Sequence, residues 1–318
     1  MYQAQFGVFC HYLSDIALKG REHTPANWNE VVNAFDVEGL AAQLTSVKAR
    51  YFVITLGQNS GYYCSPNASY DRFLGRSPST CSTRDIVADI AKALAPRGIR
   101  LMVYLPGGAP DRDAQAMQAL GWAPGKYPIW SHPEGGPDGG DPRLEGFQQK
   151  WEEIIREWST RWGTSVVGWW FDGCYYPIAM YKHPGAPNFA SFAGAARAGN
   201  PGSIVAFNPG VFNPVRTESP EEDYTAGEIN EPQAVELPGR FLDGNQFHVL
   251  TYLGPTWAGS PPRFTNEEAI RITRRIITSG GAVTWDVPIT PGGLIPEEFV
   301  AQLQAIGNNL EADPIPRP

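Results

Sequence analysis

The sequence alternates short apolar runs with amphipathic segments along its whole length, and this alternation constrains the fold more than any other feature. Runs rich in β-branched and aromatic residues predict strands, and apolar residues at helical spacing predict helices between most of them. Strands separated by helices imply a parallel sheet, and eight such strands predict a single (β/α)8 barrel of the TIM type. The predicted strands are Gln5–Cys10, Tyr51–Leu56, Ile99–Leu105, Ser165–Phe171, Ser203–Phe207, Asp223–Gly227, Phe247–Tyr252 and Ala282–Asp286. The fifth to seventh strands have weaker patterns, which predicts an irregular barrel in that region.

Helix boundaries carry their own signals. Asp36 is a predicted N-cap, Ser82 with Asp85 resembles a capping box, and Thr265 with Glu268 forms a good one. Pro296 suits the first turn of the last helix. Two apolar stripes mark long helices, one at Phe147, Trp151, Trp158 and Trp162 and the other at Phe299, Leu303, Ile306 and Leu310.

These elements predict one domain. The barrel is expected over residues 1–311, followed by a Pro-rich tail over 312–318, with no C-terminal β-sandwich. No G-x-G-x-x-G follows the first strand, which argues against a dinucleotide-binding open sheet. A long Gly- and Pro-rich loop is expected from Pro106 to Arg143.

Composition limits the partners. A net charge of −8 argues against a nucleic acid or an anionic membrane as the main partner. No run of 18 apolar residues predicts a membrane span. Ten Trp residues suit either stacking on sugar faces or filling a large core.

Cys64 and Cys81 share one polar loop and could pair in an oxidising compartment. No signal peptide is visible at the N-terminus, so the chain as given is expected to be cytoplasmic; if the given sequence lacks its signal peptide, the expected location is secreted or periplasmic. The oligomeric state stays open.

In a barrel of this kind the active site forms where the strands end. Two acids stand out there: Asp172, at the end of Gly168-Trp169-Trp170-Phe171-Asp172, and Glu228, after Tyr224-Thr225-Ala226-Gly227. The expected substrate contacts are His11, Tyr12, Gln58, Asn59, Tyr104, Trp170, Tyr175, Asn208, Trp257, Trp285 and Asp286.

Two carboxylates facing one another across a barrel mouth are typical of glycoside hydrolysis. One attacks the anomeric carbon or activates a water, and the other protonates the leaving oxygen. The alternatives are a loop-capping role for Asp172 and an ordinary loop position for Glu228, with Glu218 or Glu231 as the acid instead. Sequence spacing does not give the separation that distinguishes retaining from inverting enzymes, so both mechanisms stay open.

The histidines and acids show no metal-binding spacing such as H-E-x-x-H, so neither a metal nor a cofactor is expected. His11 follows the first strand and is a candidate ligand contact. His248 lies inside the seventh predicted strand and is expected to be a core residue.

Several segments resemble the α-L-fucosidases of glycoside hydrolase family 29. The similar segments are Gln5-Phe6-Gly7-Val8-Phe9-Cys10-His11-Tyr12, Ala49–Thr55, Gly98–Tyr104, Trp170-Phe171-Asp172-Gly173, Gly227-Glu228, and the ending Gly280–Pro296 with its repeated Gly and Pro. This resemblance implies a catalytic barrel in which Asp172 is the nucleophile and Glu228 is the acid/base.

One departure from that family lies after the second strand. The family usually has H-H-D-G there, whereas this chain has Gly57-Gln58-Asn59-Ser60-Gly61. Gln and Asn can hydrogen-bond a sugar but carry no charge. The expectation is an exo-acting, retaining hydrolase of α-L-fucosides or a related α-L-linked terminal sugar. The alternatives are a carbohydrate-binding pseudo-enzyme on the same barrel and an inverting hydrolase of a different sugar.

Overall fold

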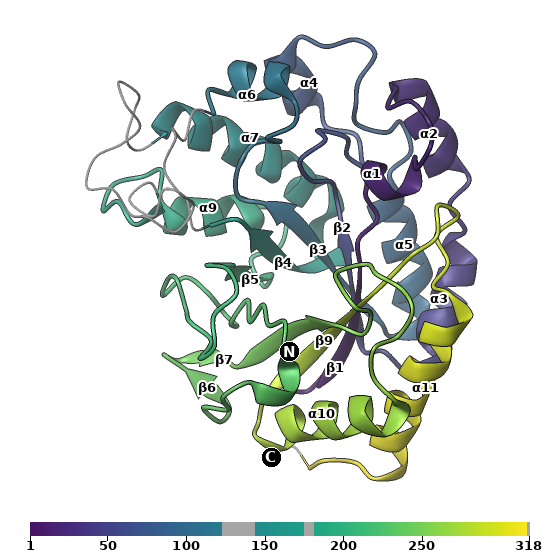
Figure 1. The fold of residues 1–318 in the computed structure, drawn as a ribbon. Coiled ribbons are helices and arrows are strands. Elements are labelled where there is room, and N and C mark those ends of the chain that lie inside the picture. Colours follow the sequence, from purple (N-terminus) through teal and green to yellow (C-terminus); the bar gives the residue numbers. More distant parts are fainter. Residues whose placement is uncertain (123–143, 175–180, 317–318) are drawn as a thin grey trace.

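Seven parallel strands form one curled sheet at the centre of the molecule (Figure 1). The computed structural model describes residues 1–122, 144–174 and 181–316. The strand order is β5-β4-β3-β2-β1-β9-β8, with every neighbouring pair parallel. The strands are β1 Phe6–Cys10, β2 Tyr51–Thr55, β3 Arg100–Pro106, β4 Val166–Asp172, β5 Ile204–Phe207, β8 His248–Tyr252 and β9 Ala282–Val287. A separate antiparallel pair joins β6 Phe241–Leu242 to β7 Asn245–Gln246.

The predicted sixth strand is the part of the barrel that departs from regular geometry. Residues 223–229 form no regular strand, but they lie between β5 and β8 and hydrogen-bond to both. The Asp223 amide donates to the Val205 carbonyl (2.9 Å), and the amides of Leu250 and Ile229 exchange bonds with the carbonyls of Gly227 and Leu250 (2.9 and 3.0 Å). The barrel prediction is therefore confirmed, with the eighth position held by an irregular segment rather than by a strand over 223–227.

Gly227 makes this close approach possible. Its φ of +64° is in the left-handed region, and a Cβ there would lie 1.9 Å from the His248 carbonyl oxygen. A residue with a side chain would push the segment away from β8 and would strain the backbone.

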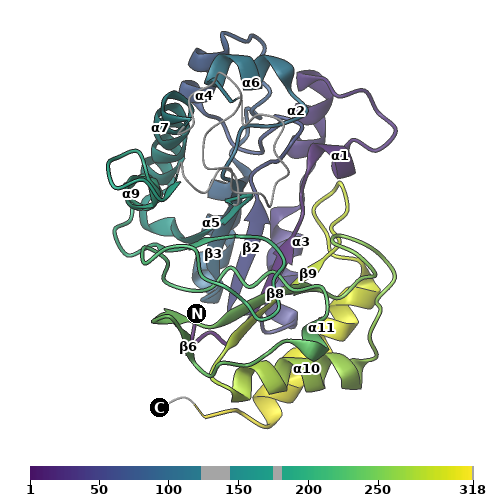
Figure 2. The ribbon, with the colours of Figure 1, turned by 60° about the vertical axis from the view of Figure 1, so that its left-hand side comes forward.

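Helices cover the outer face of the sheet and follow most strands. They are α1 Ser14–Ala17, α2 Pro25–Asn33, α3 Val37–Ser46, α4 Ala68–Leu74, α5 Ile86–Leu94, α6 Ala114–Leu120, α7 Glu145–Trp162, α9 Phe189–Ala196, α10 Asn266–Thr278 and α11 Glu297–Ala312, with short 3-10 turns at Ala95–Arg97, Gly163–Ser165 and Pro232–Ala234. In Figure 2, α10 and α11 lie side by side below β8 and β9.

Three boundary predictions can be compared with this arrangement. Asp36 caps α3, and Thr265 with Glu268 forms the capping box of α10, as predicted. The predicted capping box at Ser82 is wrong: Asp85 caps α5 by accepting from the Ala88 amide (3.0 Å), and the Ser82 hydroxyl donates to the Arg84 carbonyl instead. The predicted loop from residue 106 contains α6, and its residues 123–143 lie outside the described part of the chain.

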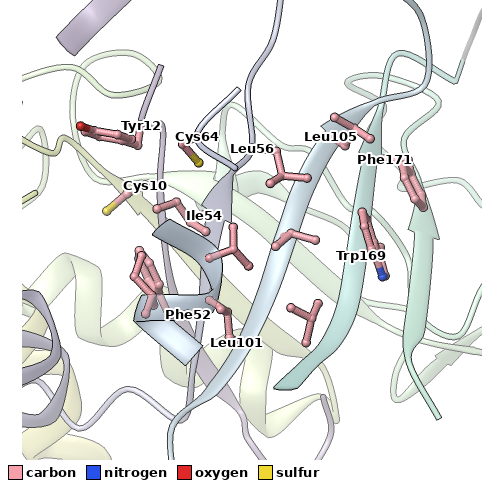
Figure 3. Close-up of a cluster of buried hydrophobic side chains, with 14 of the residues drawn as sticks. Cys10, Tyr12, Phe52, Ile54, Leu56, Cys64, Leu101, Leu105, Trp169 and Phe171 are labelled. Atoms are coloured by element: carbon pink, nitrogen blue, oxygen red, sulfur yellow. The ribbon is translucent and has the colours of Figure 1, made fainter. Parts of the chain in front are cut away.

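Side chains alternate between the two faces of the sheet, as the period of two in a strand requires. The outward set packs against the helices and includes Phe52, Ile54, Leu101, Leu105, Trp169 and Phe171 (Figure 3). The inward set fills the barrel and includes Phe9, Tyr51, Val53, Met102, Tyr104, Trp170, Ala206 and Leu250. This alternation decides which residues at the strand ends turn toward the barrel axis.

All four cysteines are buried and free, so Cys64 and Cys81 are not paired in this structure. Within the described ranges, each helix falls short of the length and apolar character that crossing a bilayer requires.

Candidate active site

Inward-facing positions place polar side chains together at the carboxyl ends of the strands. Asp172 follows the inward Trp170 by two residues, Asn208 follows Ala206, and His11 follows Phe9. The two-residue period therefore directs these three polar side chains toward the barrel axis, above the apolar filling. This is the end of a (β/α)8 barrel at which active sites form.

Asp172 is held by three donors. Its Oδ1 accepts from its neighbouring amide, that of Gly173 (2.8 Å), and from Nδ2 of Asn208 (2.9 Å). Its Oδ2 accepts from the Tyr104 hydroxyl (2.5 Å). These bonds fix the orientation of the carboxylate.

A single side-chain nitrogen links the two candidate catalytic acids. Asn208 Nδ2 donates to Asp172 Oδ1 at 2.9 Å and to Glu228 Oε2 at 2.6 Å. Those two oxygens therefore lie no more than about 5.5 Å apart, because both are within bonding distance of one atom. Asn208 is fully buried, and its Oδ1 accepts from the Gly210 amide (3.0 Å), so the amide cannot turn around without losing bonds.

Burial and the nearby Asp172 raise the pKa of Glu228 to about 7, against opposing contributions from the Asn208 hydrogen bond and from His11. A carboxyl group with such a pKa holds its proton in a substantial fraction of molecules near neutral pH. One acid held by three donors next to a second acid that retains a proton is the division of roles that acid/base chemistry needs.

His11 is oriented by a buried acid. Its Nδ1 lies 2.8 Å from Oδ1 of Asp286, whose side chain is fully buried. The other oxygen of Asp286 accepts from the Ala258 amide (2.6 Å). The imidazole also meets the Trp257 ring edge-on, with centroids 5.9 Å apart. Because Nδ1 is used by Asp286, the other ring nitrogen is the one available to a ligand.

Tyr104 forms hydrogen bonds both to Asp172 and to Gln58 in the loop after β2. Its hydroxyl accepts from Gln58 Nε2 (2.6 Å) while donating to Asp172. Its ring stacks on Trp170 at 5.4 Å between centroids, and the Trp170 indole donates to the Ala226 carbonyl (3.0 Å). Both rings are almost entirely buried, so they form a rigid support beneath the acids rather than an exposed stacking wall.

Two predicted substrate contacts are wrong because they face outward. Tyr12 lies next to the inward His11 and packs between Trp28 and Phe35 (Figure 3 shows its outward position). Trp285 alternates with Asp286 in the same way, and its indole donates to the Thr273 hydroxyl on α10 (2.9 Å). Both side chains are buried between the sheet and the helices.

The other predicted residues divide as follows. Asp286 is close to the site, but its side chain is fully buried and its two oxygens contact His11 and the Ala258 amide. The backbone carbonyl of Asn59 accepts from the Arg112 amide (2.9 Å). Tyr175 lies outside the described residues.

The competing acids have other partners. Glu218 lies 3.1 Å from the Lys182 ammonium, and Glu231 is 65% exposed and lies 4.0 Å from Arg263. Among the three candidate acids, Glu228 is thus the one that accepts a hydrogen bond from the same donor as Asp172, the Asn208 amide.

His248 is buried in the barrel between the Thr225 carbonyl and the Thr284 hydroxyl, in line with the predicted core position. Among the described residues, no group of three or more His, Cys, Asp or Glu side chains is placed to hold a metal ion.

Two functions of site residues were not predicted from the sequence. Asn208 was expected to contact a sugar, not to link two acids, and nothing in its local sequence indicates the link. The role of Asp286 toward His11 could have been inferred, because β1 and β9 are neighbours and both residues fall on inward positions.

Comparison with known proteins gives one family match and a set of structural likenesses. The family model described as alpha-L-fucosidase matches residues 22–313. A search of curated proteins finds no match.

Among solved structures, an endo-fucoidan hydrolase from glycoside hydrolase family 107 is 16% identical with a TM-score of 0.70, covering 96% of this chain and 52% of its own. This chain therefore spans about half the length of that protein. A second endo-fucoidan hydrolase of that family is 14% identical, with a TM-score of 0.71 and coverage of 100% and 95%. The alpha-L-fucosidase of Lactobacillus casei, in complex with its alpha-L-fucose product, is 15% identical, with a TM-score of 0.65 and coverage of 98% and 97%. At these identities the likenesses support the barrel fold.

Proposed function

The chain belongs to the alpha-L-fucosidase family and is a glycoside hydrolase acting on carbohydrate, and from this premise we propose that it removes terminal α-L-fucose, or a closely related α-L-linked sugar, with retention of anomeric configuration. Asp172 is the proposed nucleophile and Glu228 the proposed acid/base. The family match supports the sugar class. The arrangement of the two carboxylates supports the mechanism.

The proposed reaction has two steps. In the first, Asp172 attacks the anomeric carbon, the bond to the leaving oxygen breaks, and that oxygen takes the proton of Glu228. In the second, Glu228 removes a proton from water, the water oxygen attacks the anomeric carbon, and the bond to Asp172 breaks. The pKa of Glu228, raised to about 7, suits a group that must first give and then take a proton.

The observation that carries the retaining proposal is the shared amide of Asn208. It limits the nearest oxygens of Asp172 and Glu228 to about 5.5 Å. Retaining glycosidases place their two carboxyl groups about 5–5.5 Å apart, whereas inverting enzymes leave about 6.5–9.5 Å for a water molecule.

Sugar recognition is proposed to rely on His11, Trp257 and Gln58. The free ring nitrogen of His11 would bond a hydroxyl, and Trp257 would offer an apolar face beside it. Since Gln58 Nε2 is engaged by Tyr104, its carbonyl oxygen is the atom left to accept a bond from a sugar hydroxyl. A neutral acceptor thus lies at the position where the alpha-L-fucosidase family usually has a pair of histidines.

The decisive experiment replaces the nucleophile. Asp172→Gly is expected to abolish hydrolysis of an aryl α-L-fucoside, while its melting temperature stays within a few degrees of wild type. Added azide should restore turnover and give the β-fucosyl azide, because azide attacks from the face that the carboxylate has vacated. Undiminished hydrolysis without azide would falsify the assignment of Asp172.

Proton NMR of the first-formed sugar tests the stereochemistry. An α-anomer supports retention, and a β-anomer would show an inverting enzyme. Saturable binding of aryl fucosides without any product would show a carbohydrate-binding pseudo-enzyme instead. Release of fucose from oligosaccharide ends supports exo action, whereas shortening of fucan chains without free fucose would indicate the endo action named for two of the structural neighbours.

A further inference from the structure

A second cavity opens at the opposite end of the barrel from the candidate active site. It has a volume of about 670 Å3 and is lined where the strands begin, by residues such as Phe6, Tyr51, Arg100 and Ile204, and by the end of α11. Ligand pockets for small molecules have volumes of about 300–1,000 Å3. The cavity is therefore large enough for a small ligand, and it shares no lining residue with the acid cluster around Asp172.

Two arginines at this cavity have no acidic partner among residues 1–122, 144–174 and 181–316. Arg50 and Arg100 stand at the starts of neighbouring strands, and the Arg100 amide donates to the Arg50 carbonyl (3.1 Å). In the described part of the chain neither guanidinium forms a hydrogen bond or an ion pair. Some other arginines do have acidic partners, as Arg76 has in Asp113 and Arg84 in Asp89.

Among the described residues, the one acid in the cavity lining already has a partner. Glu311 is the ion-pair partner of Lys48, another lining residue. The lining thus carries a local excess of positive charge on a chain whose net charge is −8. Two arginines that line one cavity and have no acidic partner among the described residues are suited to bind the oxygens of one anionic group.

The rest of the lining is largely apolar. Tyr51 and Met102 are each only 2% exposed and lie at the inner end of the cavity, where they belong to the barrel filling. Leu310 and Ile315 supply the wall on the side of α11. That wall is tied to the barrel, because Gln5 Nε2 donates to the Ile315 carbonyl (3.0 Å).

We propose that this cavity binds a small amphipathic anion, namely a phosphate, sulfate or carboxylate group carried on an apolar body. Arg50 and Arg100 bind the charged group, and the apolar body lies against Tyr51 and Met102. The excess of positive charge favours the anionic group, and the buried apolar lining favours the apolar body. The proposal is independent of the hydrolytic reaction, because no catalytic residue takes part.

Calorimetric titration of the full chain with n-octyl phosphate, inorganic phosphate and n-octanol tests this site. The expected result is 1:1 binding of octyl phosphate, weakened about tenfold or more when Arg50→Gln and Arg100→Gln are combined. Inorganic phosphate and octanol should each bind at least about tenfold more weakly, since each satisfies half of the site. Arg271→Gln, on the exposed face of α10, is the matched control and should leave the affinity unchanged.

Several results would overturn the proposal. These are no saturable binding of octyl phosphate, equal affinity for inorganic phosphate, equal affinity for octanol, or an equal loss in the Arg271→Gln control. Competition by fucose would place the ligand in the active site and would also overturn it. Both arginines are exposed, so the double variant is expected to fold, and its melting curve checks this before titration.

Discussion

Removing the amide that links the two acids is the sharpest test of how this site works. Asn208→Ala deletes the donor that lies 2.6 Å from Glu228 Oε2 and 2.9 Å from Asp172 Oδ1. In the wild type, burial and the charge of Asp172 raise the pKa of Glu228, and this bond lowers it. The net pKa is about 7. The substitution therefore leaves the two raising contributions without that opposition.

The size of the effect follows from the bond. A hydrogen bond to a charged group contributes about 1.5–3 kcal/mol, and one pKa unit corresponds to about 1.4 kcal/mol. The pKa of Glu228 should therefore rise by about one to two units in Asn208→Ala. Because catalysis needs the protonated form, the basic limb of kcat/KM should move from near pH 7 to about pH 8–9. Activity at the optimum should fall about 100-fold, since the acids lose their common anchor.

The assay is the pH dependence of kcat/KM for an aryl α-L-fucoside. Asn308→Ala, at an exposed position of α11, is the matched control and should keep the wild-type profile. A basic limb that stays in place or moves to lower pH would refute the reasoning. It would mean that the acids separate without Asn208, so that Asp172 no longer raises the pKa of Glu228.

Two further predictions concern the surroundings of the acids, and a third concerns the pH dependence of stability. Tyr104→Phe removes a 2.5 Å bond to Asp172 and should lower kcat about 10- to 100-fold with little change in KM; an unchanged kcat would contradict this role. Asp286→Asn should weaken the orientation of His11 and raise KM about tenfold, and steady-state kinetics that show only a kcat effect would count against a positioning role. Burial raises the pKa of Glu222 from 4.5 to about 7, so the folded state keeps a proton that the unfolded chain releases, and stability should fall by about 3 kcal/mol as pH rises from about 4.5 to 7. Denaturant unfolding should show a smaller loss of stability with rising pH in Glu222→Gln than in the wild type, because Glu228 still contributes in both; equal slopes would disprove it.

Much of the fold was predictable because each buried strand is a compact apolar run between helix signals. The predicted strand Tyr51–Leu56 differs from β2 by one residue, and Gln5–Cys10 differs from β1 by one. Irregular backbone was harder to predict: residues 223–229 carry the alternation of a strand, but the left-handed Gly227 interrupts the ladder. The helix α6 was missed because it is only seven residues long and lies among Gly and Pro.

The site was partly predictable for a similar reason. Asp172 stands two residues after an inward Trp170, so its direction follows from the strand period alone. The same rule separates His11 from Tyr12 and Asp286 from Trp285, and applying it would have removed the two wrong contacts. The link through Asn208 depends on distances between β4, β5 and the irregular segment, and such distances are set by the tertiary structure rather than by any local pattern.

The two acids are carried by backbones of very different regularity. Asp172 ends a strand that is paired on both sides, whereas Glu228 belongs to a segment tied to β8 by a few bonds and to β5 by even fewer. Local opening is easiest where backbone bonds are sparse. Amide hydrogen exchange should therefore be faster along 223–229 than along β4. Opening of this segment would move the proposed proton donor away from the proposed nucleophile while β4 stays folded, so the local stability of residues 223–229 would limit the proposed reaction.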